Sequence, residues 1–285
     1  MTEPQTVPSK EIETRGEALL LPGERLDEIN EELSLILKTD GLTFGTDAYL
    51  LSAFIKPSPR ARAVELGAGT GVISLLLATK GKLKSAVAVE LQPDYAELCE
   101  RNVRLNRLED RITTLRADVR TLSAHSIGYE CELVYTNPPY MRTDTGRPNE
   151  CSRKNIARHE TAGGIRDFCL AAARLLKHGG IFACVYRPDR LIDLTVALRE
   201  AKLEPKRMTF VSADKKTAPS MVLVEARKGG AEGLTVTPPL LLYRESDGTG
   251  VRTPSDEARK VYDTCTLYPT QQNKRTRSIS APEKE

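Results

Sequence analysis

The feature that most constrains the fold is a regular alternation of short apolar strands with amphipathic helices, which begins at residue 62 and ends at residue 228. The expected strands cover 62–67, 85–91, 111–118, 131–137, 181–187, 206–212 and 220–228, and the expected helices cover 70–81, 92–108, 165–180 and 188–202. This alternation is typical of crossover units in a parallel sheet that is covered on both faces. The sequence therefore predicts a doubly wound α/β domain around a seven-stranded, mostly parallel sheet.

The segments on either side of this pattern are of a different kind. Residues 1–40 are expected to form an N-terminal extension, with a polar, mobile end over 1–22 and a helix over 25–38, where leucine and isoleucine recur at helical spacing. The main domain is expected over 41–230. Residues 231–285 lose the alternation, and we expect a C-terminal extension that is partly disordered.

Composition narrows the class of protein. No apolar run approaches the roughly 20 residues that span a bilayer, and the N-terminus lacks a signal-peptide pattern, so we expect a cytoplasmic protein with no membrane partner. The six cysteines include no CxxC pair, which favours reduced thiols and predicts no metal site. The formal net charge of +3 permits nucleic-acid binding without arguing for it. The sequence leaves the oligomeric state open, a monomer included.

The strand over 62–67 ends in a glycine-rich turn, VELGAGTGV, which places Glu65, Gly67, Gly69 and Gly71 directly before a helix. Ligands of open α/β sheets bind at the carboxyl ends of the strands, and glycines let the backbone approach them closely. The spacing is not GxGxxG, because Val72 holds the place of the third glycine, and Glu65 would repel a pyrophosphate. The turn suits a ligand with positive charge; the alternative is a tight turn that binds nothing.

Two further acids follow the next two strands. Glu90 lies about 20 residues after the glycines, where an acid can accept hydrogen bonds from two ribose hydroxyls. Asp118 ends the third strand, where it can accept from the exocyclic amine of an adenine ring. S-adenosylmethionine fits all three acids, because it carries an ammonium and a sulfonium and has no phosphate. It is the cofactor that we expect.

The fourth strand ends in the tetrad Asn137, Pro138, Pro139 and Tyr140. Each proline restricts the residue before it, so Asn137 and Pro138 are expected to be extended at the rim of the cofactor pocket. The Asn137 side-chain oxygen and the Pro138 carbonyl can accept both N–H groups of a conjugated amine and orient its nitrogen. Tyr140 offers a face on which a planar acceptor can stack. The alternative is a rigid turn without chemistry.

These motifs resemble the class I S-adenosylmethionine-dependent methyltransferases through ELGAGTG, VELQP, ERNVRLN and RAD, over residues 41–228. The resemblance implies that Glu65 and the glycine loop hold the methionine portion, Glu90 the ribose and Asp118 the adenine. The segment LTFGTDAYLLSAF resembles the one that closes over the methionine end in amine methyltransferases, which makes Thr46 and Asp47 candidates for cofactor binding. The alternative is that Thr46 or Asp47 is a helix N-cap.

The tetrad resembles a signature shared by N6-adenine methyltransferases and by N5-glutamine methyltransferases of release factors. The glutamine enzymes carry a sizeable helical domain before the glycine loop, whereas this chain has only about 60 residues there, which favours a nucleobase. The long loop over 141–164 is basic, and loops of this length are usually functional. Its cations could take the phosphates beside a flipped base, or they could be a solvated face; the candidates are Arg142, Lys154, Arg158 and His159.

The order of FGTDA, ELGAGTG, TNPPY, ARHE, RKGG and PPLLLY resembles the bacterial family of tRNA adenine N6-methyltransferases, and SDEARKVY matches the helix that closes that family's domain. The resemblance covers residues 24–262. It implies methyl transfer from S-adenosylmethionine to N6 of an adenine in RNA, with a tRNA near its anticodon as the expected partner. Three alternatives stay open: a glutamine of a protein factor, an adenine in DNA, and a non-catalytic, cofactor-dependent RNA-binding module.

Overall fold

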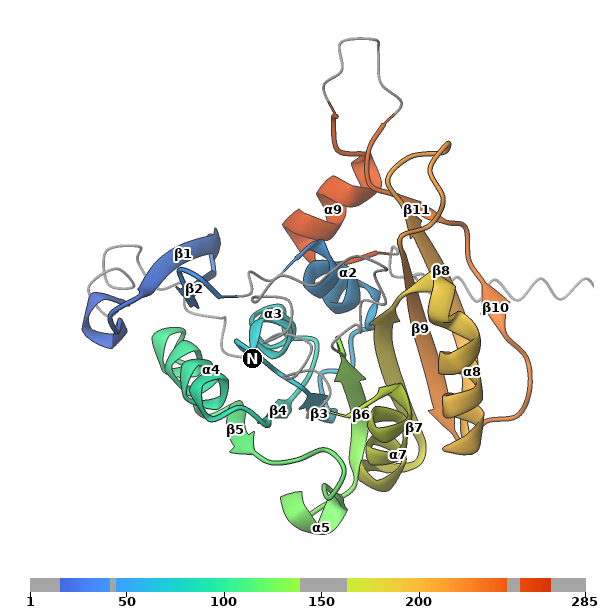
Figure 1. Cartoon of the computed structure of the whole chain (residues 1–285), viewed down its shortest axis with the longest axis horizontal. Helices are drawn as coiled ribbons and strands as arrows, with labels where there is room; N and C mark the ends of the chain where they lie inside the picture. Colours follow the sequence, from blue (N-terminus) through green and yellow to red (C-terminus); the bar gives the residue numbers. More distant parts are fainter. Residues whose placement is uncertain (1–15, 42–44, 139–162, 245–251, 268–285) are drawn as a thin grey trace, which may run out of the picture.

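The structure is a computed structural model that describes residues 16–41, 45–138, 163–244 and 252–267. A nine-stranded sheet forms its centre, in the order β10-β8-β9-β7-β6-β3-β4-β5, with β11 also beside β8 (Figure 1). The long strands are β3 (Arg62–Leu66), β4 (Ser85–Glu90), β5 (Ile112–Arg116), β6 (Cys131–Thr136), β7 (Leu176–Tyr186), β8 (Leu203–Ser212) and β9 (Met221–Lys228). The predicted seven-stranded core is confirmed, and β10 (Thr235–Val236) and β11 (Leu240–Leu241) extend it.

The sheet is parallel except around β9. The strands β5, β4, β3, β6 and β7 pair in parallel, whereas β9 runs antiparallel between β7 and β8. The start of β9 therefore lies beside the end of β7, with Val222 opposite Tyr186. Because β11 pairs with the last residues of β8, residues 213–220 and 240–244 lie at the same edge of the sheet as the ends of the parallel strands.

Helices cover both faces of the sheet. One face packs against α2 (Thr46–Phe54), α3 (Val72–Thr79) and α9 (Asp256–Thr264), and α4 (Pro93–Leu105) also lies on this side. The other face packs against α7 (Ile165–Leu175) and α8 (Leu191–Glu200). Side chains alternate along each strand, so Ala63 and Tyr135 enter the first core while Val64 and Val134 enter the second. The short helices α5 (Ala124–Ile127) and η1 (Pro188–Arg190) lie in connections.

The helix predicted over residues 25–38 is wrong. This segment forms an antiparallel hairpin of β1 (Glu24–Asn30) and β2 (Leu33–Lys38), with Leu26 opposite Ile36 (Figure 1). The residues from Leu33 to Leu37 are all buried, on both faces of β2. A strand that is buried on both faces shows no alternation of apolar and polar residues, so its leucines and isoleucines imitated helical spacing.

The hairpin contacts α4 through asparagine side chains that hydrogen-bond to the backbone of β2, as a neighbouring strand would. The Asn102 side chain accepts from the backbone N–H of Ile36 at 2.7 Å and donates to the Ile36 carbonyl at 3.2 Å. Asn106 makes the equivalent pair of bonds with the backbone of Ser34, at 3.1 and 2.8 Å. The segment ERNVRLN, which the sequence assigned to a family resemblance, therefore closes the open edge of β2.

The predicted helix over 165–180 is too long at its C-terminal end. The helix α7 ends at Leu175, and β7 begins at Leu176. Residues 176–180 join the strand through a register shift, because Cys131 of β6 pairs with Leu176 while Leu133 pairs with Ile181. The irregularity includes Gly179 and Gly180, which have no side chain and so add nothing to a pattern of apolar and polar residues.

Two buried cations hold the C-terminal end of α2. The Lys82 ammonium donates to the carbonyls of Ser52 at 2.6 Å and Ile55 at 2.7 Å, and the Arg207 guanidinium donates to the Phe54 carbonyl at 2.7 Å. Burial lowers the pKa of Lys82 to about 8. These bonds satisfy carbonyls that a helix leaves without intrahelical partners, and positive charge there suits the helix dipole.

Asn102 is expected to stabilise the fold more than Asn106 does. Besides its two bonds to Ile36, buried Asn102 donates to the Thr70 carbonyl at 3.0 Å, so Asn102→Ala leaves several buried backbone groups unsatisfied. We expect a loss of about 2–3 kcal/mol in the free energy of unfolding, measured by urea denaturation. Asn106→Ala, at a partly exposed site, is the matched control and should lose less than half as much. Equal losses would contradict this account.

Candidate active site

The glycine-rich loop that follows β3 is tied to the neighbouring strand β4. The backbone N–H groups of Gly67 and Ala68 both donate to the Val89 carbonyl, each at 2.9 Å. Gly71 has a φ of 82°, and a Cβ there would lie 2.6 Å from the Cys99 sulfur, so no other residue fits without a shift. The loop is a fixed cradle at the carboxyl edge of the sheet, where ligands of such folds bind.

Glu90, the last residue of β4, fixes the same loop with its side chain. One carboxylate oxygen accepts from the Gly69 N–H and the other from the Gln92 N–H, both at 2.9 Å. Each carboxylate oxygen has a second lone pair, so Glu90 keeps the capacity to accept from a ligand's hydroxyl groups. The structure places Glu90 beside the glycine loop, as the sequence placed it.

Glu65 is fully buried beneath the loop. Its carboxylate accepts from the backbone N–H of Ser74 at 3.1 Å and from the Ser74 hydroxyl at 2.5 Å, and that hydroxyl also lies 2.7 Å from the Tyr135 hydroxyl. Burial raises the pKa of Glu65 to about 8, although the hydrogen bonds from Ser74 act against this shift. Its described contacts therefore brace the start of α3, and its role toward the methionine portion stays a prediction.

Asp118 follows β5 and is paired with Arg120. The Asp118 carboxylate accepts from the Arg120 backbone N–H at 2.8 Å and from its guanidinium at 2.5 Å. The bonds from the Arg120 side chain are the main reason that the pKa of Asp118 is lowered. The backbone of this turn also meets β4, because the Ala117 N–H donates to the Glu90 carbonyl at 3.1 Å. Asp118 is therefore an ionised acceptor next to Glu90.

Asn137 directly follows β6 and stands at the same edge. The preceding residue, Thr136, donates from its hydroxyl to the Leu66 carbonyl at 2.7 Å, which ties the end of β6 to the start of the glycine loop. The Asn137 amide nitrogen donates to a carboxylate oxygen of Asp47 at 2.8 Å, and Pro138 is buried beside it. The structure thus brings Asn137, Asp47 and the glycine loop together.

Thr46 and Asp47 begin the helix α2. The N-cap of α2 is Gly45, so the alternative in which Thr46 or Asp47 caps the helix is wrong, and both residues lie in its first turn. The Tyr262 hydroxyl of α9 donates to the Thr46 hydroxyl at 3.2 Å, and the rings of Tyr262 and Tyr49 meet edge to face at 5.1 Å. Figure 1 shows α9 lying against α2. The helix predicted at SDEARKVY therefore braces the start of α2.

The remaining predicted site residues lie outside the described part of the chain. Within the tetrad, Pro139 and Tyr140 lie outside the described residues. The predicted substrate cations lie outside them too; they are Arg142, Lys154, Arg158 and His159.

Where the structure does describe the chain, no three histidine, cysteine, aspartate or glutamate side chains gather as a metal site requires. None of the helices in these ranges combines the length and apolarity that a bilayer-spanning helix needs.

Known proteins are similar to this chain in sequence. Residues 56–135 match the family model for the TRM5/TYW2 methyltransferase domain. A tRNA1(Val) (adenine(37)-N6)-methyltransferase of Dyadobacter fermentans is 30% identical over 205 residues, which cover 71% of this chain and 82% of that protein. The chain belongs to the family of tRNA1(Val) (adenine(37)-N6)-methyltransferases. A second member, from Porphyromonas gingivalis, is 28% identical over 189 residues, 64% of this chain and 73% of that protein.

Solved structures agree on the fold of this tRNA1(Val) (adenine(37)-N6)-methyltransferase family member. The structure of Atu636 from Agrobacterium tumefaciens, described as a predicted O-methyltransferase, superposes with a TM-score of 0.61 at 22% identity, over 79% of this chain and 99% of that chain. Trm5 of Methanocaldococcus jannaschii in complex with adenosine superposes with a TM-score of 0.51 at 19% identity, over 74% of this chain and 57% of that chain. At such identities the likeness concerns the fold, which is that of class I methyltransferases.

S-adenosylmethionine is the cofactor of the family, and the groups at this edge fit it. The carboxylates of Glu90 and Asp118 follow two adjacent strands, and the glycine loop above the buried Glu65 offers close backbone approach. A phosphate-bearing dinucleotide would meet negative charge here, whereas a cationic ligand with a ribose and an adenine meets acceptors. In this family member, Glu90 and Asp118 would hold the nucleoside.

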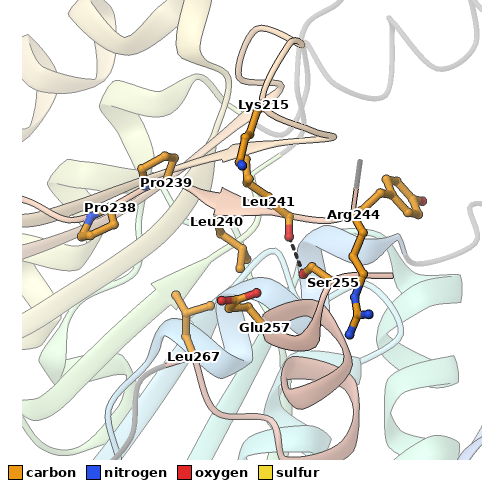
Figure 2. Close-up of a pocket in the computed structure, with 10 residues that line it drawn as sticks. Lys215, Pro238, Pro239, Leu240, Leu241, Arg244, Ser255, Glu257 and Leu267 are labelled. Carbon is orange, nitrogen blue, oxygen red and sulfur yellow. Dashed lines mark hydrogen bonds between the residues drawn. The ribbon is translucent and has the colours of Figure 1, made fainter. Parts of the chain in front are cut away.

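A cavity of about 650 Å³ lies at the same edge, between β11 and the start of α9 (Figure 2). The hydroxyl of Ser255, the N-cap of α9, donates a hydrogen bond to the Leu241 carbonyl at 2.6 Å; it is the dashed line in Figure 2. Prolines and leucines supply much of the wall, and charged groups stand among them; the lining residues are Lys215, Pro238, Pro239, Leu240, Leu241, Tyr243, Arg244, Ser255, Glu257 and Leu267. None of the predicted active-site residues that the structure describes lines this cavity.

Sequence reasoning missed the partners of the predicted residues. Ser74 beneath Glu65 and Arg120 beside Asp118 carry no motif of their own. The contact between Asp47 and Asn137 joins residues 90 positions apart, although each residue had been singled out separately. The nearest available signal was that both motifs, FGTDA and TNPPY, were expected around one pocket.

The buried carboxyl of Glu65 should make stability depend on pH. Because its folded-state pKa of about 8 lies above the ordinary 4.5, its contribution is full below pH 4.5 and is lost as pH rises to about 8. We expect the free energy of unfolding of wild type, relative to Glu65→Gln, to fall between pH 5 and about 8. Glu109→Gln, which removes an exposed carboxylate, should keep the wild-type trend. A difference that stays constant over this range would contradict the burial of a protonated Glu65.

Proposed function

We propose that this protein transfers a methyl group from S-adenosylmethionine to N6 of an adenine in tRNA, at adenine 37 of a valine tRNA. The observation that carries the proposal is the place of Asn137, at the end of β6 and tied to the glycine loop through Thr136 and Leu66. An acceptor held by Asn137 would meet the cofactor at this edge. The names of the related enzymes supply the tRNA and the position.

The residues of the tetrad perform positioning chemistry in this proposal. S-adenosylmethionine, when bound, supplies an electrophilic methyl group. The Asn137 side-chain oxygen and the Pro138 carbonyl each accept one N–H of the adenine amine, which turns the nitrogen lone pair toward that methyl group. As the new N–C bond would form, the bond from the methyl group to sulfur would break with its electron pair left on sulfur, so the nitrogen becomes positive and its N–H groups become stronger donors to both oxygens. One of these protons then leaves to water, so no strong base is needed.

The support for RNA over other acceptors comes from several sides. The two relatives are named as tRNA enzymes, and the TRM5/TYW2 domain model matches residues 56–135. The predicted phosphate contacts of Arg142, Lys154, Arg158 and His159 stay predictions. We expect these cations to act on the RNA backbone.

The direct test is incubation of the protein with labelled S-adenosylmethionine and unmodified bulk tRNA. Nucleoside analysis should find the label in N6-methyladenosine, and fragment mapping should place it at adenine 37 of a valine tRNA. Parallel incubations with double-stranded DNA and with a release factor test the two other acceptors. Label in a different nucleoside, in DNA or in protein glutamine would overturn the proposal.

Asn137→Ala is expected to abolish transfer while leaving cofactor binding nearly intact. Removal of one preorganised hydrogen-bonding group of this kind lowers kcat by about 10²-fold or more. Asn30→Ala, at the end of β1, removes an asparagine outside the site and should keep wild-type activity. The measurements are the methylation rate on tRNA and the S-adenosylmethionine Kd by calorimetry. Retention of most activity in Asn137→Ala would refute the acceptor role.

A further inference from the structure

A carboxamide can present either of two unlike groups to its substrate. Rotation of the Asn137 side chain by half a turn exchanges its oxygen, which accepts, with its NH2 group, which donates. The adenine amine carries two N–H donors, so only the oxygen can bind it. An NH2 group in that place would oppose donor to donor. The reaction therefore needs a contact that fixes the orientation of the Asn137 side-chain amide.

The structure contains a group that does so. The Asn137 nitrogen lies 2.8 Å from a carboxylate oxygen of Asp47, in a partly buried contact. An ionised carboxylate only accepts hydrogen bonds, so it binds the NH2 group and excludes the oxygen. With the NH2 group turned to Asp47, the amide oxygen faces away from it. A bond to an ionised partner is also stronger than a neutral one.

The position of Asp47 is itself fixed. It lies in the first turn of α2, where the helix dipole favours negative charge. The C-terminal end of the helix is held by Lys82 and Arg207, and its first residue is held by the Tyr262 hydroxyl at 3.2 Å. Asp47 is therefore presented to Asn137 by a helix that is anchored at both ends.

We propose that Asp47 is a positioning residue that orients the Asn137 amide, with its oxygen toward the amine that is methylated. This inference rests on the proposed function of Asn137 and assigns Asp47 a different task from the predicted contact with the cofactor. The charge of Asp47 also polarises the amide, so the Asn137 oxygen accepts more strongly as the amine becomes positive. Asp47 acts through Asn137, and the bond that it makes is to the protein.

The first test compares Asp47→Asn with wild type. An asparagine at this position can meet Asn137 with either its oxygen or its NH2 group, so the amide loses its preferred orientation while the shape is kept. We expect the single-turnover rate of methyl transfer to fall about 10-fold, with the S-adenosylmethionine Kd and the tRNA KM unchanged. Asp94→Asn, the same change in the first turn of α4, is the matched control and should keep wild-type rates.

The second test exchanges the two groups. Asn137→Asp alone places two carboxylates together and should lose activity by repulsion. The double variant Asp47→Asn with Asn137→Asp restores one donor and one carboxylate, with an oxygen still free to face the amine. We expect it to transfer methyl groups about 10-fold faster than Asn137→Asp alone, a coupling that unrelated losses would not produce.

A readout that needs no substrate completes the design. The side-chain amide signal of Asn137 in a nitrogen–proton NMR spectrum, assigned by its loss in Asn137→Ala, should shift in Asp47→Asn and stay in place in Asp94→Asn. The inference is overturned if Asp47→Asn raises the cofactor Kd at an unchanged single-turnover rate, if the exchange shows no coupling, or if the amide signal does not move. Wild-type transfer to an acceptor other than tRNA adenine would overturn the proposed function alone, because the same ratios can be measured on that acceptor.

Discussion

The candidate active site, at the carboxyl edge of the sheet, depends on the hydrogen bonds that two buried cations make to the end of α2. A helix leaves its last carbonyls without partners, and Lys82 and Arg207 supply them from the loop before β4 and from β8. The pKa of Lys82, lowered to about 8 by burial, shows that this anchoring requires the desolvation of a charge. The helix α2 is thereby held between the sheet and α9, and Asp47 in its first turn contacts Asn137.

The glycine loop is held on three sides in a similar way. The strand β4 contributes the Val89 carbonyl and the Glu90 carboxylate, α4 contributes Asn102, and Thr136 ties the end of β3 to β6. A loop that is fixed before its ligand arrives loses little conformational entropy on binding. The same groups connect the hairpin to the site, because Asn102 contacts both Ile36 of β2 and Thr70 of the loop. The N-terminal hairpin is therefore part of the frame around the cofactor.

The sequence predicted the elements that follow from a local repeat of apolar and polar residues. It did not predict the hairpin, which depends on contacts with distant residues. The alternation over 62–228 predicted the sheet and the strand-end positions of Glu65, Glu90, Asp118 and Asn137, because parallel strands bring their carboxyl ends to one edge. The hairpin was missed because β2 is buried on both faces and its open edge is closed by Asn102 and Asn106, which are more than 60 residues away. Its local pattern alone contained no sign of a strand.

The candidate site shows the same division. Residue types at strand ends indicated acceptors for a cationic nucleoside, but they could not show that Glu65 turns inward to Ser74 or that Asp118 pairs with Arg120. Both of these contacts lie within ten residues in the chain, yet they depend on which way a side chain turns, and periodicity does not report this. The contact between Asp47 and Asn137 adds a long-range example.

The fold alone does not choose the acceptor of the methyl group. The structure superposes on Atu636, described as a predicted O-methyltransferase, although this chain belongs to a family named for adenine N6 methylation, because the sheet sets only where the strand ends lie. What distinguishes this chain is the group that stands at the end of β6 and the helix that faces it. An amide needs a defined orientation to bind an NH2 group, and a carboxylate on an anchored helix provides one. In our proposal, the choice of acceptor lies in the pairing of α2 with β6 through Asp47 and Asn137.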